Sequence, residues 1–234
     1  WSVREATHGG CPPLVDARSM QPKRGELKGC GASTRLVMGE IAADPKLKLI
    51  VLAARWPLYN GDKPYYDTGN PPHRMLDART PGDRVYPLDE ALSRTLGAIA
   101  RAGTKAQVIV LGPVPELTLS PSYCVAMARH LHRAEWRCWD APATLPLSRA
   151  RPAETAIARA LSGAPWVRTF SPSGRLCTET SCVTVLRRRL LYFDDDHLSA
   201  TGARMLVPGW LDEALSPRAP EPAPRPSGPP RPPR

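Results

Sequence analysis

The sequence predicts a three-layer α/β domain with a mostly parallel sheet, and two apolar runs with a helical pattern between them carry this prediction. Residues 49–54 (LIVLAA) and 107–112 (QVIVLG) are apolar runs of strand length. Such runs are typical of strands buried on both faces, as in parallel sheets that helices cover. Residues 88–101 repeat leucine and isoleucine at helical spacing, and Gly103 follows as a stop signal. A strand–helix–strand unit is therefore expected.

The other elements are predicted from helical spacing, short apolar runs and turn residues. Helices are expected over residues 122–132, 152–161 and 200–215, and strands over residues 2–7 and 166–170. Ser199 precedes the last helix as its N-cap. Residues 57–87 are rich in Gly, Pro, Asp and Tyr, so this connection is expected to run over the surface near the strand ends, where such sheets bind ligands.

Composition divides the 234 residues into a domain over 1–215 and a disordered tail over 216–234. The tail holds 9 of the 28 prolines and four arginines, without a large apolar residue. No apolar run approaches the roughly 18–20 residues that cross a bilayer, which excludes a transmembrane helix within this sequence. The formal net charge of +10 names no partner by itself, and Arg187–Arg189 lack the interleaved aromatic residues of a nucleic-acid site.

Six cysteines lie in three local couples and none forms a CxxC motif. An even, closely spaced set favours disulfides in an oxidising compartment. Of the 15 possible connectivities, the one with the shortest loops joins Cys11 to Cys30, Cys124 to Cys138 and Cys177 to Cys182. Free buried thiols remain an alternative, and a zinc site is weaker because no second close Cys or His couple is present.

The segment before the last predicted helix places Asp194 three residues ahead of His197. On a tight turn, this spacing lets the carboxylate accept from one imidazole nitrogen and leaves the other free to take a proton. Asp194 is thus the candidate orienting acid and His197 the candidate general base. A solvated acidic turn that caps a helix is the structural alternative. A metal site on Asp194, Asp195, Asp196 and His197 is a weaker alternative, because adjacent residues do not converge on one ion without a matching partner group elsewhere, and no metal ligand is assigned.

Five short motifs lie in order along the chain: CPPL at 11–14, VLAARW at 51–56, GPVPE at 112–116, the couple 177–182, and DDDHLSATGA at 194–203. Each is weak alone. Together, their order and spacing over nearly all of residues 1–215 resemble the SGNH domain attached to bacterial acyltransferase-3 membrane proteins. The resemblance implies a flavodoxin-like SGNH-hydrolase sandwich on the periplasmic side of the inner membrane, which agrees with the cysteine argument.

In that family, a multi-span membrane domain delivers an acyl group from cytoplasmic acyl-CoA, and the SGNH domain passes it to a hydroxyl of a surface polysaccharide. The resemblance therefore implies O-acyl transfer, with acetyl as the expected group. It implies the membrane domain and the polysaccharide as partners, and no nucleic acid. No cofactor is expected in this domain, while acyl-CoA is the expected donor for the full-length protein.

The family's Asp-x-x-His element falls on Asp194 and His197, but its nucleophile has no counterpart. That nucleophile is a Ser in a Gly-Asp-Ser motif at the end of the first strand, and the sequence contains no Gly-Asp-Ser. In relatives, the motif lies upstream of the segment that resembles residues 2–7. Residues 1–215 are therefore expected to lack the first strand and the nucleophile, and this chain alone is expected to be inactive.

The oxyanion hole also departs from the hydrolase pattern, in which a Gly N–H and an Asn side chain donate. Here Ala54 is followed by Arg55 and Trp56, without an Asn. Arg55 or Trp56 are the candidates to donate to an oxyanion or to line the acceptor site, and a packing role for Trp56 is the alternative.

Three other functions stay open. A soluble carbohydrate esterase of the SGNH class would use water as the acceptor. A non-catalytic saccharide-binding remnant would keep the fold without the nucleophile. A basic adaptor would use the Pro/Arg tail on acidic partners.

Overall fold

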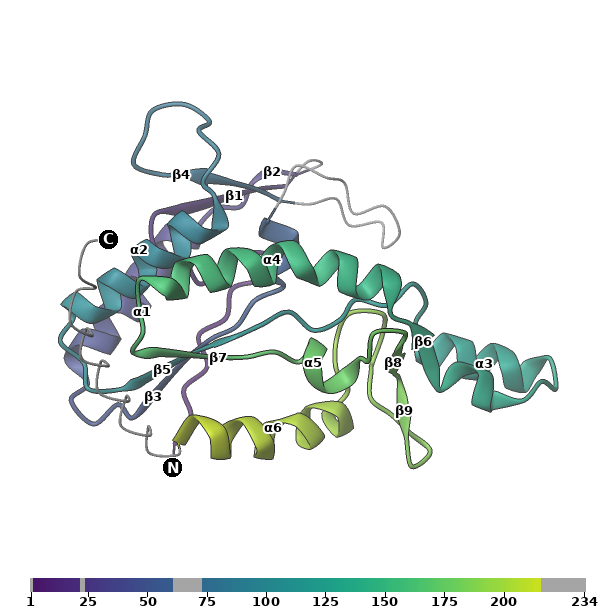
Figure 1. The fold of residues 1–234 in the computed structure, drawn as a ribbon. Coiled ribbons are helices and arrows are strands. Elements are labelled where there is room, and N and C mark those ends of the chain that lie inside the picture. The colour runs from purple at the N-terminus through teal and green to yellow at the C-terminus, as the bar shows by residue number, and fades with distance from the viewer. Residues whose placement is uncertain (1, 22–23, 61–72, 216–234) are drawn as a thin grey trace, which may run out of the picture.

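A computed structural model describes residues 2–21, 24–60 and 73–215 (Figure 1). Its central sheet consists of β3 (Leu49–Leu52), β5 (Gln107–Leu111) and β7 (Val167–Phe170), which are parallel and lie in the order β3-β5-β7. Both apolar runs are therefore strands that pair directly, as predicted. The expected tail over 216–234 lies outside the described residues.

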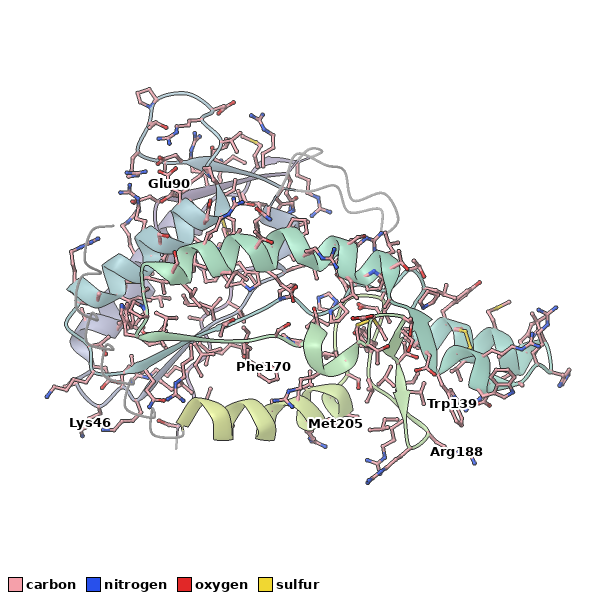
Figure 2. All side chains as sticks on the ribbon, in the orientation of Figure 1. Lys46, Glu90, Trp139, Phe170, Arg188 and Met205 are labelled. Carbon is pink, nitrogen blue, oxygen red and sulfur yellow. A yellow bond between two sulfur atoms is a disulfide. The ribbon has the colours of Figure 1, made fainter. Side chains whose placement is uncertain are left out.

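Helices lie on both sides of this sheet. Figure 1 shows α4 (Thr144–Ser162) and α2 (Leu88–Arg101) on one side, with α1 (Cys30–Ala43) nearby, and α6 (Ala200–Leu215) on the other. Figure 2 places Phe170 of β7 between its strand and α6. Helix α2 has the predicted bounds, and α6 begins after Ser199, whose Oγ accepts the Gly202 N–H at 3.0 Å. These helices bury most of the central strands, but Val51 of β3 is 38% exposed, so the expected burial on both faces does not hold along the whole of β3.

The remaining described strands are antiparallel, so the expectation of a mostly parallel sheet holds for the central sheet alone. One group is β1 (Ala17–Gln21), β2 (Gly25–Glu26) and β4 (Arg74–Asp77), in the order β2-β1-β4. Two more pairs join β6 (Asp140–Pro142) to β8 (Ser181–Val183) and β9 (Val185–Leu186) to β10 (Arg189–Leu190). Strand β4 lies inside the expected surface connection 57–87, which is therefore partly a sheet.

Two predicted elements differ from the structure. The expected strand over residues 2–7 is wrong, because these residues form no ladder with any strand that the structure describes. Helix α4 begins eight residues earlier than predicted and contains Pro152 in its interior. A proline there removes one backbone hydrogen bond. Burial continues along one stripe on both sides of it, at Pro146, Ala150, Ala153, Ile157 and Ala160.

Short helices complete the chain. They are η1 (Trp56–Tyr59), α3 (Pro121–His130), η2 (Glu135–Cys138) and α5 (Ser173–Leu176). In Figure 1, α3 extends from one end of the molecule, and Figure 2 shows Trp139 and Arg188 in the same region. No helix within the described ranges has the length and hydropathy to cross a membrane.

Three disulfides join the expected couples, and all six cysteines are used. Cys11–Cys30 ties the N-terminal segment to α1, and Cys124–Cys138 ties α3 to η2. Cys177–Cys182 ties the residue after α5 to β8. The free-thiol and zinc alternatives are thereby excluded for these residues. A small apolar cluster that includes Leu117, Leu191 and Tyr192 packs around the third bridge and supports the segment that carries His197.

Candidate active site

Residues 193–199 form a tight turn between β10 and α6. The Phe193 N–H donates to the His197 carbonyl at 2.8 Å, and Asp194 Oδ1 accepts the backbone N–H groups of Asp196 at 3.0 Å and His197 at 2.7 Å. The Leu117 N–H donates to the Asp195 carbonyl at 2.7 Å, which anchors the turn to the segment after β5. The backbone of the turn thus fixes where the His197 side chain emerges.

Asp194 and His197 meet as their spacing predicted. Asp194 Oδ2 lies 2.9 Å from Nδ1 of the imidazole, so Nε2 is directed elsewhere. Burial raises the pKa of Asp194, but the backbone N–H groups of Asp196 and His197 and the imidazole outweigh it and hold the pKa at about 2. Burial lowers the pKa of His197, whereas hydrogen bonding to Asp194 and the charges of Asp196 and Asp194 raise it above its usual value. The pair has the geometry of an oriented general base.

Arg55 connects three segments at the carboxyl ends of the strands. Its Nε and Nη2 donate to the two carboxylate oxygens of Glu116 at 2.9 and 3.0 Å, and its Nη1 pairs with Asp196. The Glu116 side chain is 2% exposed and the Asp196 side chain 6%. Burial raises the pKa of Asp196 to about 6, although the Arg55 guanidinium opposes that rise.

The sequence predicted neither Glu116 nor Asp196 as a partner of the Asp194–His197 pair or of Arg55. Glu116 ends the GPVPE motif that follows the second apolar strand, and Asp196 stands in the DDDH run, so both signals were present in the sequence. Arg55 and Glu116 are 61 positions apart in the sequence, so no local pattern could show that their side chains meet.

Trp56 packs in the core. Its side chain has 0% exposure, and its indole N–H donates to the Leu111 carbonyl. Because that single donor is occupied and enclosed, the structure gives Trp56 the packing role and leaves it no contact with an oxyanion.

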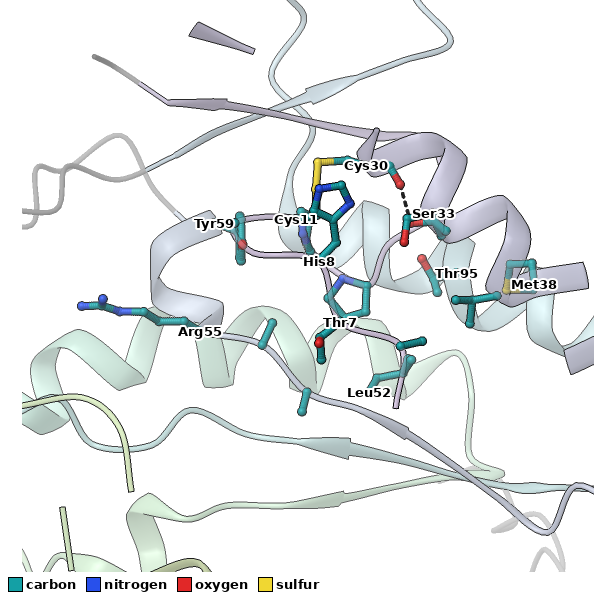
Figure 3. Close-up of a pocket in the computed structure, with 18 of the residues that line it drawn as sticks. Thr7, His8, Cys11, Cys30, Ser33, Met38, Leu52, Arg55, Tyr59 and Thr95 are labelled. Carbon is teal, nitrogen blue, oxygen red and sulfur yellow. Dashed lines mark hydrogen bonds between the residues drawn. A yellow bond between two sulfur atoms is a disulfide. The ribbon is translucent and has the colours of Figure 1, made fainter. Parts of the chain in front are cut away.

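A cavity of about 510 Å³ opens beside the turn that carries His197 (Figure 3). Its walls come from residues 6–13, α1 and the carboxyl end of β3, and Arg55 and His197 are also part of the lining. In Figure 3, the Arg55 side chain points away from Thr7 and His8 on the opposite wall. A pocket of this volume, lined by apolar side chains together with Arg55 and His197, has room for a ligand or a chain segment.

Comparison with protein families identifies the type of domain. The model of the SGNH domain fused to AT3 domains matches residues 1–212. The chain belongs to this family. A solved structure, the periplasmic domain of the lipopolysaccharide acetyltransferase of Salmonella ser. Paratyphi A, is similar to the chain, with a TM-score of 0.56 and 18% identity over 89% of this chain and 70% of that one. This likeness shows the fold alone. No curated protein matches the chain.

The described part of this SGNH domain contains an oriented imidazole without an attacking group beside it. Within those residues, no hydroxyl is hydrogen-bonded to His197, and every cysteine is in a disulfide. Asp194, Asp196 and His197 bring one possible metal-ligand atom each within 4.8 Å, but Asp196 already pairs with Arg55. A guanidinium next to a donor set disfavours a cation there.

Proposed function

We propose that this SGNH domain is the periplasmic part of a membrane O-acyltransferase and passes an acyl group, acetyl, to a hydroxyl of a cell-surface polysaccharide. The observation that carries the proposal is the Asp194–His197 pair, with His197 at the cavity. Membership of a family fused to AT3 domains supports an acyl-transfer context, and the three disulfides support a periplasmic location.

The proposed chemistry is a double displacement. A serine hydroxyl attacks the carbonyl carbon of the acyl donor while His197 Nε2 takes its proton, and Asp194 stabilises the imidazolium. The imidazolium then gives that proton to the leaving group of the donor. In the second half, His197 takes a proton from the sugar hydroxyl as its oxygen attacks the acyl-serine, and returns it to the serine.

We infer that the serine comes from a strand outside residues 1–234. Among the described strands, β3 pairs only with β5, and its carboxyl end lines the cavity together with residues 6–13. A strand laid between these walls would extend the parallel sheet, would complete a flavodoxin-like sandwich, and would bring its own carboxyl end close to His197. The donor of the acyl group is then the upstream membrane domain, which draws on acyl-CoA.

The test uses the full-length membrane protein in cells that make the polysaccharide. O-acetyl groups on the purified polysaccharide are counted by proton NMR for the wild type and for His197→Ala. His130→Ala, which changes an exposed histidine on α3, is the matched control. We expect His197→Ala to lower acetylation by about 10²-fold or more and His130→Ala to leave it unchanged. Wild-type acetylation in His197→Ala would overturn the proposal.

The same assay separates transfer from hydrolysis. An esterase would release free acetate from an acetylated polysaccharide and would add none. Release without addition by the wild-type protein would therefore replace the transferase by the carbohydrate esterase.

A further inference from the structure

Two carboxylates face the same imidazole nitrogen. Nδ1 of His197 lies 2.9 Å from Asp194 Oδ2 and also 2.9 Å from Asp196 Oδ1. A neutral imidazole has one N–H to give at this position. It is hydrogen-bonded to Asp194, while Asp196 lies within ion-pair distance and acts on the ring through its charge. The sequence motif calls for only one of them.

The two carboxylates have different surroundings. The Asp194 side chain is 35% exposed, whereas that of Asp196 is 6% exposed. The negative charge of Asp194 is stabilised by hydrogen bonds from backbone N–H groups of the turn. The negative charge of Asp196 is stabilised by Arg55, whose guanidinium pairs with Oδ2, the oxygen that does not face His197. A buried carboxylate without such a partner would be unfavourable or protonated.

Arg55 is itself held in one orientation. Its bidentate contact with the buried Glu116 fixes the plane of the guanidinium, because a planar fork matches the two oxygens of a carboxylate. Glu116 follows β5, and Arg55 follows β3. The line Glu116–Arg55–Asp196–His197 therefore runs from two strand ends to the imidazole.

We propose that Asp196 is a second positioning residue for His197 and that Arg55 and Glu116 hold it in place. The proposal rests on His197 being the general base. The charged groups that act on the imidazole are Asp194 and Asp196 from its own turn and Arg55 from the end of β3. Glu116 lies beyond Arg55, and His8 and Tyr59 are the other titratable side chains that line the cavity. When His197 carries its extra proton, both Asp194 and Asp196 stabilise that charge, so removal of either one leaves the other in contact.

The first test measures the His197 imidazole directly. Histidine-labelled chain 1–234 is titrated by NMR, and His197→Ala assigns the signal. We expect Asp196→Asn to lower the pKa of His197 by about one pH unit, as the loss of a nearby opposite charge does. Asp195→Asn is the matched control from the same turn and should leave the value unchanged, since its side chain shows no contact with the imidazole. An unchanged pKa in Asp196→Asn would overturn the proposal.

The second test separates positioning from folding in the full-length protein. We expect Asp196→Asn and Glu116→Gln, each alone, to lower kcat for polysaccharide acetylation by about tenfold with little change in KM. In the double variant Asp194→Asn/Asp196→Asn, we expect kcat to fall to the level of His197→Ala. Equal activity of Asp194→Asn and the double variant would contradict a role for Asp196. If His197→Ala kept full activity, the proposed function would fail. The NMR titration would still decide whether Asp196 contacts the His197 imidazole, because it does not depend on activity.

Discussion

Gly202 in the first turn of α6 lies so close to Leu191 that a Cβ at this position would come within 2.1 Å of the Leu191 carbonyl oxygen. Leu191 precedes the turn that carries His197, and its carbonyl also accepts the Ser199 N–H at 2.9 Å. The absence of a side chain at Gly202 therefore sets how closely α6 packs against the start of the turn that carries His197.

Gly202→Ala should displace this contact, because the clashing atom is backbone and cannot rotate away. We expect a loss of about 1–3 kcal/mol in the free energy of unfolding, as overpacking causes, measured by urea denaturation of the chain. Gly209→Ala lies in the same helix with nothing within 4 Å of the added Cβ, so it should be neutral or slightly stabilising. Equal stabilities of the two variants would contradict the close packing.

The low pKa of Asp194 makes stability depend on pH in the acid range. The folded pKa of about 2 lies below the ordinary value of 3.8, so the contribution is fully present above about 4 and is lost as pH falls from about 4 to about 2. Asp194→Asn should show a shallower loss of stability across this window in thermal melts. Parallel curves for wild type and Asp194→Asn would show that the carboxylate is not held in the folded state.

The raised pKa of His197 predicts the acid limb of the transfer rate. Only the neutral imidazole accepts a proton, so kcat for acetylation should rise with pH through an inflection above the ordinary histidine value of 6.5. Asp194→Asn removes a contact that favours the charged form and should move this inflection to lower pH. An inflection that stays in place would assign the limb to another group.

Residues 1–234 alone should form no acyl-enzyme. An activated ester such as p-nitrophenyl acetate should give no burst of p-nitrophenol with this chain, because no nucleophile lies beside His197 in the part that the structure describes. A burst that matches the protein concentration and disappears in His197→Ala would show that a nucleophile is present after all.

Trp56→Phe should separate packing from catalysis. Phenylalanine keeps most of the buried ring but leaves the Leu111 carbonyl without its donor, so we expect about 1–3 kcal/mol lower stability. In the full-length protein, the turnover rate per folded molecule should not change. If acetylation instead became slower by about 10²-fold or more, without a loss of stability, an oxyanion role for Trp56 would be restored.

Local patterns predicted the parts of this molecule that depend on neighbours in sequence. The apolar strands β3 and β5, the bounds of α2 and the contact between Asp194 and His197 all follow from spacing within a few residues. The short antiparallel strands β1 and β4 escaped prediction because neither has the continuous apolar run or the regular polar–apolar alternation that marks a strand, and β4 also stands in a segment dominated by turn residues.

Contacts between residues far apart in the sequence could not be predicted, because they depend on how the strands are arranged in the sheet. The bidentate pair of Arg55 and Glu116 exists only because β3 and β5 are parallel neighbours whose ends lie side by side. The start of α4 was missed because a proline ordinarily marks a helix start, whereas the buried alanine stripe here outweighs that signal at Pro152.

The Cys11–Cys30 bridge closes a ring with a sequence separation of 19, and both of its cysteines line the cavity. One wall of the cavity is thus covalently preorganised, with part of its chain entropy removed before any occupant binds. A strand that docks in this cavity would therefore meet a wall whose shape is already set, so less chain entropy would be lost on docking than if residues 11–30 were unbridged.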